Sequence, residues 1–161
     1  MEASSANETS VTRHAQSEAQ TLALGEALGR ALAPGLLIFL RGVLGAGKTT
    51  FARGVLRGLG YRGKVKSPSF TLVELYELSR LYLYHFDFYR LDKPGSWQDA
   101  GLRDYFGTDA VCLVEWPENA AGTLPPPDIE ARFALAGEAR DIRLIAQSEA
   151  GRRCLNALDG S

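Results

Sequence analysis

The 161-residue sequence has only two cysteines, almost no net charge and no long hydrophobic run. Cys112 and Cys154 lack metal-type spacing and are too few for a disulfide framework, which favours a reducing compartment. The longest apolar run that suits a buried position, Leu36–Leu40, is far below the ~18–20 residues that span a bilayer. The polar N-terminus has no secretory pattern. We therefore expect a cytoplasmic protein without a membrane segment.

Charge of one sign is also missing, since 18 basic residues stand against 19 acidic ones. No global field therefore draws this chain to nucleic acid. The stretch from Arg53 to Lys66 is a local exception, with five basic residues and no acidic one. It is either a surface that contacts phosphate or an acidic partner, or an ordinary solvated face.

Strands and helices alternate along the sequence, which predicts an α/β fold. We expect a mainly parallel sheet flanked by helices, with an antiparallel C-terminal hairpin around Gly137 at its edge. Residues 1–16 are expected to be flexible, and residues 17–161 to form a single domain. The expected elements are a helix from Ser17 to Pro34, a strand at 36–40, a helix ending at Gly60, strands at 72–78 and 81–89, a helix at 97–106 begun by Ser96, a strand at 110–114, two hairpin strands after Pro127 and a helix from Glu149.

The segment Gly42–Thr49 matches the phosphate-loop pattern G-x-x-x-x-G-K-[ST] and lies between a predicted strand and a predicted helix. In that setting backbone N–H groups and the helix N-terminus surround a phosphate. Lys48 is expected to reach the β and γ phosphates, and Thr49 to offer its hydroxyl to Mg²⁺. The pattern therefore predicts nucleotide binding and an α/β fold of the P-loop NTPase type. Because the chain contains no N-K-x-D tetrapeptide, GTP is disfavoured.

Two carboxylates, Asp87 and Glu115, follow predicted buried strands, and ligands bind at the carboxyl ends of strands in such sheets. A buried acid there needs a cation or donors nearby, and Mg²⁺ would supply that charge. The alternative for Asp87 is that it pairs with Arg90 or caps a turn. His85 is interpreted as a packed or supporting residue rather than a ligand. The loop Ser67–Thr71 is either a switch segment or an ordinary turn.

Four segments, taken together and in this order, resemble the bacterial TsaE (YjeE) family. They are Gly42–Phe51, Lys66–Glu74, His85–Leu91 and Leu113–Pro117. The resemblance extends from about Ser17 to Ala150. It implies that residues 17–161 form a single P-loop ATPase domain, which is needed to form N6-threonylcarbamoyladenosine at position 37 of tRNA and acts with the proteins TsaD and TsaB. With these partners in view, we predict that the basic stretch from Arg53 to Lys66 is a surface for a partner or for tRNA, with the ordinary solvated face as the alternative. The resemblance also implies ATP and Mg²⁺ as cofactors.

Residue roles carried over from the family form three groups. Thr49 and Glu115 would bind Mg²⁺. Asp87 would support the metal or a water, Glu115 would also be catalytic, and Thr71 would belong to a switch-like loop. The nucleotide site implied by the resemblance consists of Leu44, Gly45, Ala46, Gly47, Lys48, Thr49, Thr50, Glu18, Trp116 and Arg140.

The sequence departs from the family pattern at Val43, where the family commonly has aspartate. That side chain is not a phosphate ligand, so the N–H cradle should survive, whereas any polar contact to neighbouring loops or partners would be lost. Two other functions stay open. The phosphate loop alone would permit a small-molecule or nucleoside kinase. A nucleotide-dependent binding module that does not hydrolyse ATP is the second.

Overall fold

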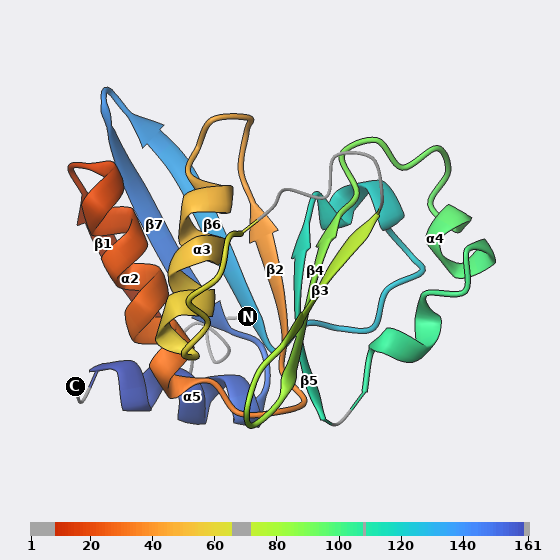
Figure 1. Ribbon diagram of the computed structural model, residues 1–161. Coiled ribbons are helices and arrows are strands. Elements are labelled where there is room, and N and C mark those ends of the chain that lie inside the picture. Colours follow the sequence, from red (N-terminus) through yellow and green to blue (C-terminus); the bar gives the residue numbers. More distant parts are fainter. Residues whose placement is uncertain (1–8, 66–71, 108, 160–161) are drawn as a thin grey trace.

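The computed structural model describes residues 9–65, 72–107 and 109–159. Its centre is one seven-stranded sheet with the strand order β1-β7-β6-β2-β5-β4-β3 (Figure 1). The strands are β1 (Ser10–Ala15), β2 (Leu37–Arg41), β3 (Val73–Glu77), β4 (Tyr82–Asp87), β5 (Ala110–Glu115), β6 (Ile129–Ala136) and β7 (Ala139–Ala146). The expected α/β fold is confirmed.

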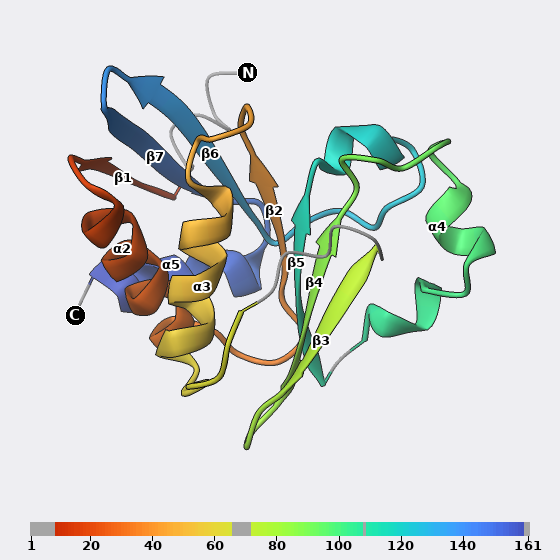
Figure 2. The same cartoon turned by 45° about the horizontal axis from the view of Figure 1, so that its top comes forward.

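Helices cover both faces of the sheet. The α-helices are α2 (Glu18–Ala31), α3 (Lys48–Gly58), α4 (Ser96–Asp99) and α5 (Glu149–Asp159), and the 3₁₀ helices are η1 (Arg103–Tyr105) and η2 (Pro117–Ala120). In both Figure 1 and Figure 2, α2 and α3 lie side by side over one half of the sheet, and α4 lies beyond the other half. None of the helices in the described ranges is long and apolar enough to cross a membrane.

The sheet is more mixed than predicted. The four strands β6, β2, β5 and β4 pair in parallel, and antiparallel strands flank them on both sides. Every residue of β5 is buried, as its apolar sequence predicts for a strand covered on two faces. The predicted hairpin around Gly137 forms from β6 and β7. It lies one place inside the edge because β1 pairs with β7.

The prediction that residues 1–16 are flexible is wrong for Ser10–Ala15, which form β1. Val11 and Ala15 are buried against the core from this strand. Pairing with β7 satisfies the backbone hydrogen bonds of this strand, and its polar sequence gives no local indication of that pairing. The helix that follows begins as predicted, because Ser17 Oγ accepts a hydrogen bond from the Gln20 N–H at 3.2 Å.

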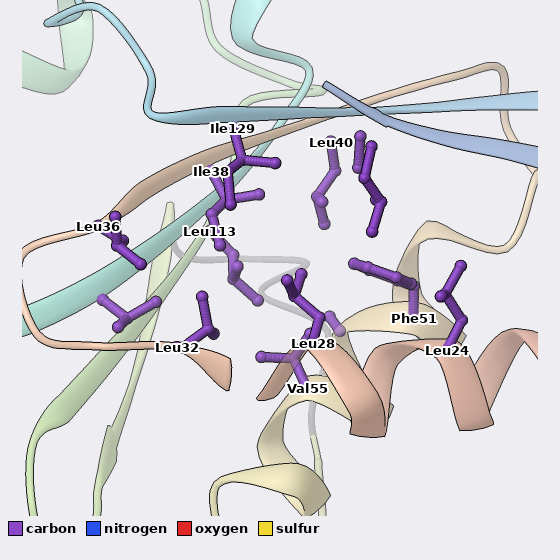
Figure 3. Packing of buried hydrophobic residues seen from close by; sticks show 14 of the residues in the cluster. Leu24, Leu28, Leu32, Leu36, Ile38, Leu40, Phe51, Val55, Leu113 and Ile129 are labelled. Carbon is purple, nitrogen blue, oxygen red and sulfur yellow. The ribbon is translucent and has the colours of Figure 1, made fainter. Parts of the chain in front are cut away.

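The main core lies between the sheet and the pair α2 and α3. Figure 3 shows apolar side chains of β2, β5 and β6 pointing towards those of the two helices. The labelled residues on the sheet are Ile38, Leu40, Leu113 and Ile129, and those on the helices include Leu28, Phe51 and Val55. This packing fixes where β2 ends and α3 begins, and so positions the loop between them.

Four glycines allow α2 and α3 to approach closely: Gly25 and Gly29 on α2, and Gly54 and Gly58 on α3. A Cβ added at Gly25 would lie 2.3 Å from the Phe51 carbonyl oxygen, and one at Gly54 would lie 2.3 Å from the Leu22 carbonyl oxygen. Contacts that short leave no room for any side chain. The two helices therefore pack backbone against backbone.

The expected helix at 97–106 is the clearest error among the predicted elements. The structure has the single turn α4 and then η1, because Gly101 takes the left-handed conformation with φ of 78°. Trp97 is buried in the second apolar cluster, and its Nε1–H donates to Thr123 Oγ1 at 2.7 Å. The predicted α5 and the strand at 110–114 are confirmed.

Candidate functional site

The site is built around the loop that joins β2 to α3 (Figure 1). Gly47 caps α3 with φ of 102°, a conformation that favours glycine, and has no side chain that would occupy the helix N-terminus. Gly42 approaches β6 so closely that an added Cβ would lie 2.9 Å from the Phe133 carbonyl oxygen. The loop therefore presents backbone N–H groups and the positive end of α3 to whatever lies in front of it.

In front of this loop is a pocket of about 500 Å³. Its walls come from the start of α2, the loop after β2, the ends of β4 and β5, and the β6–β7 hairpin. Among the residues predicted for the site, those that line the pocket are Glu18, Leu44, Gly45, Gly47, Lys48, Thr49, Thr50, Asp87, Glu115, Trp116 and Arg140. Residues from five separate segments of the sequence thus meet in one cavity.

Ala46 and Val43, which have predicted or noted roles, do not line the pocket. Ala46 is fully buried, and its N–H donates to the Val43 carbonyl oxygen at 3.2 Å, so it shapes the loop from within. Val43 is 55% exposed and outside the pocket, as expected for a side chain that is not a phosphate ligand. Thr71 and the rest of the predicted switch loop lie outside the described residues.

The sequence analysis missed five residues of the pocket wall: Ala15, Ser17, Thr21, Tyr89 and Glu138. Ser17 was recognised only as a helix cap. Thr21 lies four residues after Ser17 and one helical turn further along α2, and this spacing could have indicated from the sequence that the two residues share a face. Glu138 and Ala15 reach the pocket only through the pairing of β7 with β6 and β1, which the local sequence does not indicate.

Lys48 is the buried cation of the site, with only 5% of its surface exposed. Its Nζ donates to the Gly42 carbonyl oxygen at 2.5 Å and lies 3.7 Å from the centroid of the Trp116 ring. Burial lowers the pKa of Lys48, while Glu115, Glu118 and Asp87 act in the opposite direction. No carboxylate of the described residues comes within ion-pair distance of Lys48, so no direct ion pair neutralises its charge.

Asp87 and Glu115 end the neighbouring parallel strands β4 and β5, and they are register partners. Asp87 Oδ1 accepts the Tyr89 N–H at 3.0 Å, so the predicted alternative of a turn cap is real and coexists with its place in the pocket. The other alternative is wrong in the described part of the chain, where Asp87 forms no ion pair with Arg90. Burial and the nearby Glu115 charge raise the pKa of Asp87.

Beneath the pocket, Glu115 is held by a buried histidine. The Nε2 atom of His85 lies 2.7 Å from Oε2 of Glu115, and the two side chains are 0% and 5% exposed. His85 does not line the pocket itself. The interpretation of His85 as a supporting residue therefore agrees with its position.

Trp116 follows Glu115 directly and has the left-handed backbone values φ 58° and ψ 47°. Such values are uncommon for a bulky residue and carry a cost, which other contacts must offset. The Tyr89 ring lies 5.0 Å from the Trp116 ring, and Lys48 approaches it as described above. This conformation turns the indole into the pocket wall.

Arg140 and Glu18 connect other parts of the pocket wall to the phosphate loop and to α3. Arg140 Nη2 donates to the Gly45 carbonyl oxygen at 3.1 Å, which ties the β6–β7 hairpin to the phosphate loop. Glu18 Oε2 accepts from Thr50 Oγ1 at 3.5 Å, a long contact that joins the start of α2 to α3. Both residues therefore contact the loop or its helix, as well as line the pocket.

The basic stretch lies apart from this pocket. Arg57, Arg62 and Lys64 are exposed and Arg53 is half-buried, whereas Lys66 lies outside the described residues. None of these four has a carboxylate within ion-pair distance in the part of the chain that the structure describes. Their role as a surface for a partner or for tRNA stays a prediction.

A glycine-bearing loop between a parallel strand and a helix, facing two carboxylates at adjacent strand ends, defines a P-loop-type α/β protein. The chain belongs to the TsaE family: the family model described as "Threonylcarbamoyl adenosine biosynthesis protein TsaE" matches residues 15–145.

Individual relatives agree with this assignment. A Haemophilus influenzae protein named tRNA threonylcarbamoyladenosine biosynthesis protein TsaE is 48% identical over 122 residues, covering 76% of this chain and 77% of the relative. The Bacillus subtilis protein of that name is 38% identical over 134 residues, covering 83% and 82%. The crystal structure of Bacillus subtilis YdiB superposes with a TM-score of 0.82 at 30% identity, covering 95% of this chain and 96% of that one.

Proposed function

We propose that this protein is a Mg²⁺-dependent ATP-binding and ATP-hydrolysing component of the machinery that forms N6-threonylcarbamoyladenosine in tRNA, in the cytoplasm. The observation that carries this proposal is the pocket of about 500 Å³ in which Lys48 and the phosphate loop face Asp87 and Glu115. Membership of the TsaE family supports the pathway.

The binding of phosphates follows from the charges on the pocket wall. Lys48 and the N-terminus of α3 supply positive potential at one end, and backbone N–H groups of the loop supply donors. In our proposal Lys48 leaves the Gly42 carbonyl oxygen and pairs with the β and γ phosphates. Arg140 keeps the loop in place through Gly45.

The oxygen ligands of the site suit Mg²⁺. Thr49 contributes a hydroxyl and Glu115 a carboxylate, both of which line the pocket and are hard donors. The described residues contain no cluster of three or more His, Cys, Asp or Glu side chains that could hold a metal ion. The pair Thr49 and Glu115 therefore suits an ion that is also coordinated by the phosphates of the nucleotide, as Mg²⁺ usually is. When bound, Mg²⁺ would neutralise charge on the transferring phosphoryl group.

Hydrolysis further requires that a water be oriented towards the γ phosphate. Asp87 is suited to that role because it lies in the pocket and is anchored by the Tyr89 N–H, which leaves its other oxygen for a water. Its raised pKa favours accepting a proton. Glu115, held by His85, would bind the metal while Asp87 orients the water or supports the metal.

We expect the protein to act with TsaB and TsaD, with hydrolysis resetting the transferase complex between turnovers rather than forming the modification itself. The decisive experiment measures steady-state Mg·ATP hydrolysis by the purified protein, alone and after adding TsaB, TsaD and tRNA. A slow basal rate that rises with the partners, and is absent in Lys48→Ala, supports the proposal. Transfer of phosphate to a small molecule without any response to the partners would instead favour the kinase.

A further inference from the structure

His85 occupies the boundary between the main core and the candidate site. It lies on β4 between Leu83, which is buried in the core beneath α2 and α3, and Asp87, which lines the pocket. Residues two apart on a strand share one face, so these three side chains form one row that runs from the core into the site. His85 itself is 0% exposed.

The chemistry of this position is unusual for a packing residue. Nε2 of His85 lies 2.7 Å from Oε2 of Glu115, and a carboxylate that binds a metal ion only accepts hydrogen bonds, so in this pair the imidazole is the donor, in the tautomer with its proton on Nε2. That leaves Nδ1 buried with no hydrogen-bond partner among the described residues. An orphaned buried nitrogen is unfavourable, and an aliphatic side chain of similar size would avoid that penalty. Packing alone therefore does not account for a histidine here.

What the histidine supplies is one directed N–H. We infer that His85 is a positioning residue: its Nε2–H holds Oε2 of Glu115 and thereby leaves Oε1 for the pocket. No hydrogen bond to Oε1 is made by the residues that the structure describes. This inference rests on the proposed function in one respect, namely that Glu115 binds the Mg²⁺ that accompanies the nucleotide.

A carboxylate with one oxygen fixed behaves differently from a free one. Without the His85 donor, Glu115 would stay buried but would be free to rotate and to turn either oxygen to the pocket. Partners that orient a metal ligand in this way typically change metal affinity by 10–100-fold. The side chain of Asp87 would keep its position, because the Tyr89 N–H anchors it independently. The expected consequence of losing His85 is thus a weaker metal site, with nucleotide binding in the absence of metal unchanged.

Calorimetric titration with ADP, once with Mg²⁺ and once with EDTA, distinguishes an effect on metal binding from an effect on nucleotide binding. The wild-type protein should bind ADP more tightly with Mg²⁺. We expect His85→Leu to lose about tenfold or more of that Mg²⁺-dependent gain, with the affinity in EDTA unchanged within about twofold. His85→Gln, whose amide N–H reaches near the Nε2 position, should regain most of it. His85→Asn, which is too short, should not.

Melting temperatures establish whether each variant is folded. If His85→Leu does not fold, the comparison of His85→Gln with His85→Asn tests the inference instead. A cycle with Glu115→Ala adds a further condition: once Glu115 is removed, His85→Leu should have no additional effect on the Mg²⁺-dependent gain. Three results would each overturn the inference. His85→Leu could lose ADP affinity equally with and without Mg²⁺, or a folded His85→Leu protein could keep the full Mg²⁺-dependent gain in ADP affinity. The wild-type protein could also bind ADP without any such gain. Wild-type protein that binds Mg·ADP with the gain but does not hydrolyse ATP would overturn the proposed function alone.

Discussion

The Nζ atom of Lys48 lies 3.7 Å from the centre of the Trp116 ring and 2.5 Å from the Gly42 carbonyl oxygen. In this state the lysine charge rests against a π face and a backbone dipole, with no carboxylate of the described residues in ion-pair distance. Both partners are weaker than a phosphate, so a phosphate would draw the ammonium away from them. The environment of the Trp116 ring therefore depends on the position of the Lys48 ammonium group.

The first prediction uses this contact as a signal. Adding Mg·ATP should change the tryptophan emission of the protein, because the cation over the Trp116 ring moves. The sequence contains only one other tryptophan, Trp97, which is buried away from the pocket. Trp97→Phe should therefore keep the response and Trp116→Phe should abolish it. A response that survives in Trp116→Phe would contradict the assignment.

The second prediction concerns the lysine itself. Lys48→Ala should weaken ATP binding by about 30-fold or more, about 2 kcal/mol, because phosphate would enter the pocket without its main cation. Calorimetry measures the affinity. Lys93→Ala is a matched control, since Lys93 is exposed and outside the pocket, and its affinity should stay within twofold of the wild-type value. An unchanged affinity in Lys48→Ala would refute phosphate binding by this lysine.

The third prediction follows from the raised pKa of Asp87. Between its unfolded value of 3.8 and its higher folded value, the folded protein holds more protons than the unfolded chain. Asp87 therefore favours the folded state at low pH, and that contribution is lost as the pH rises through this window. At neutral pH its buried charge is a net cost.

Asp87→Asn removes this charge while keeping the Oδ1 acceptor for the Tyr89 N–H. We expect urea unfolding to give a free energy of unfolding that is about 0.5–2 kcal/mol higher than for wild type at pH 7. The gain should shrink as the pH is lowered towards 3.8. A variant that is less stable at pH 7, or a gain that grows in acid, would show that the sign is wrong. Turnover should fall in either case.

The parts of the site that the sequence predicted share one property: each depends on a short segment. The phosphate loop, the cap at Ser17 and the strands that end in Asp87 and Glu115 are determined by local pattern, and parallel strands then bring their carboxyl ends together. The convergence of Asp87, Glu115 and Lys48 could therefore be predicted once three strand ends were known.

The features that were missed depend on contacts between distant segments. The strand β1 forms because β7 offers it a partner, and α4 ends at Asp99, ahead of the left-handed Gly101, in a segment whose Trp97 side chain donates to the distant Thr123. The orphaned Nδ1 of His85 appears only when β4 lies against β5. Two missed features did leave a local trace. Thr21 follows Ser17 at helical spacing, and the glycines of α2 and α3 are four residues apart on each helix, which predicts close approach only when both helices are considered together.

The last prediction tests that close approach. Gly54→Ala should destabilise the protein by about 1–3 kcal/mol, although alanine is the better helix former, because its Cβ would lie 2.3 Å from the Leu22 carbonyl oxygen and force α2 and α3 apart. Gly95→Ala is the control: the nearest atom to an added Cβ there is Gln98 Oε1 at 3.6 Å, and the cost should stay below about 1 kcal/mol. Urea unfolding measures both. Since α3 begins at the phosphate loop and contacts α2 through Thr50 and Glu18, Gly54→Ala should also weaken ATP binding. Equal stability of the two variants would mean that the helices can separate at no cost, and that their glycines do not hold the loop in place.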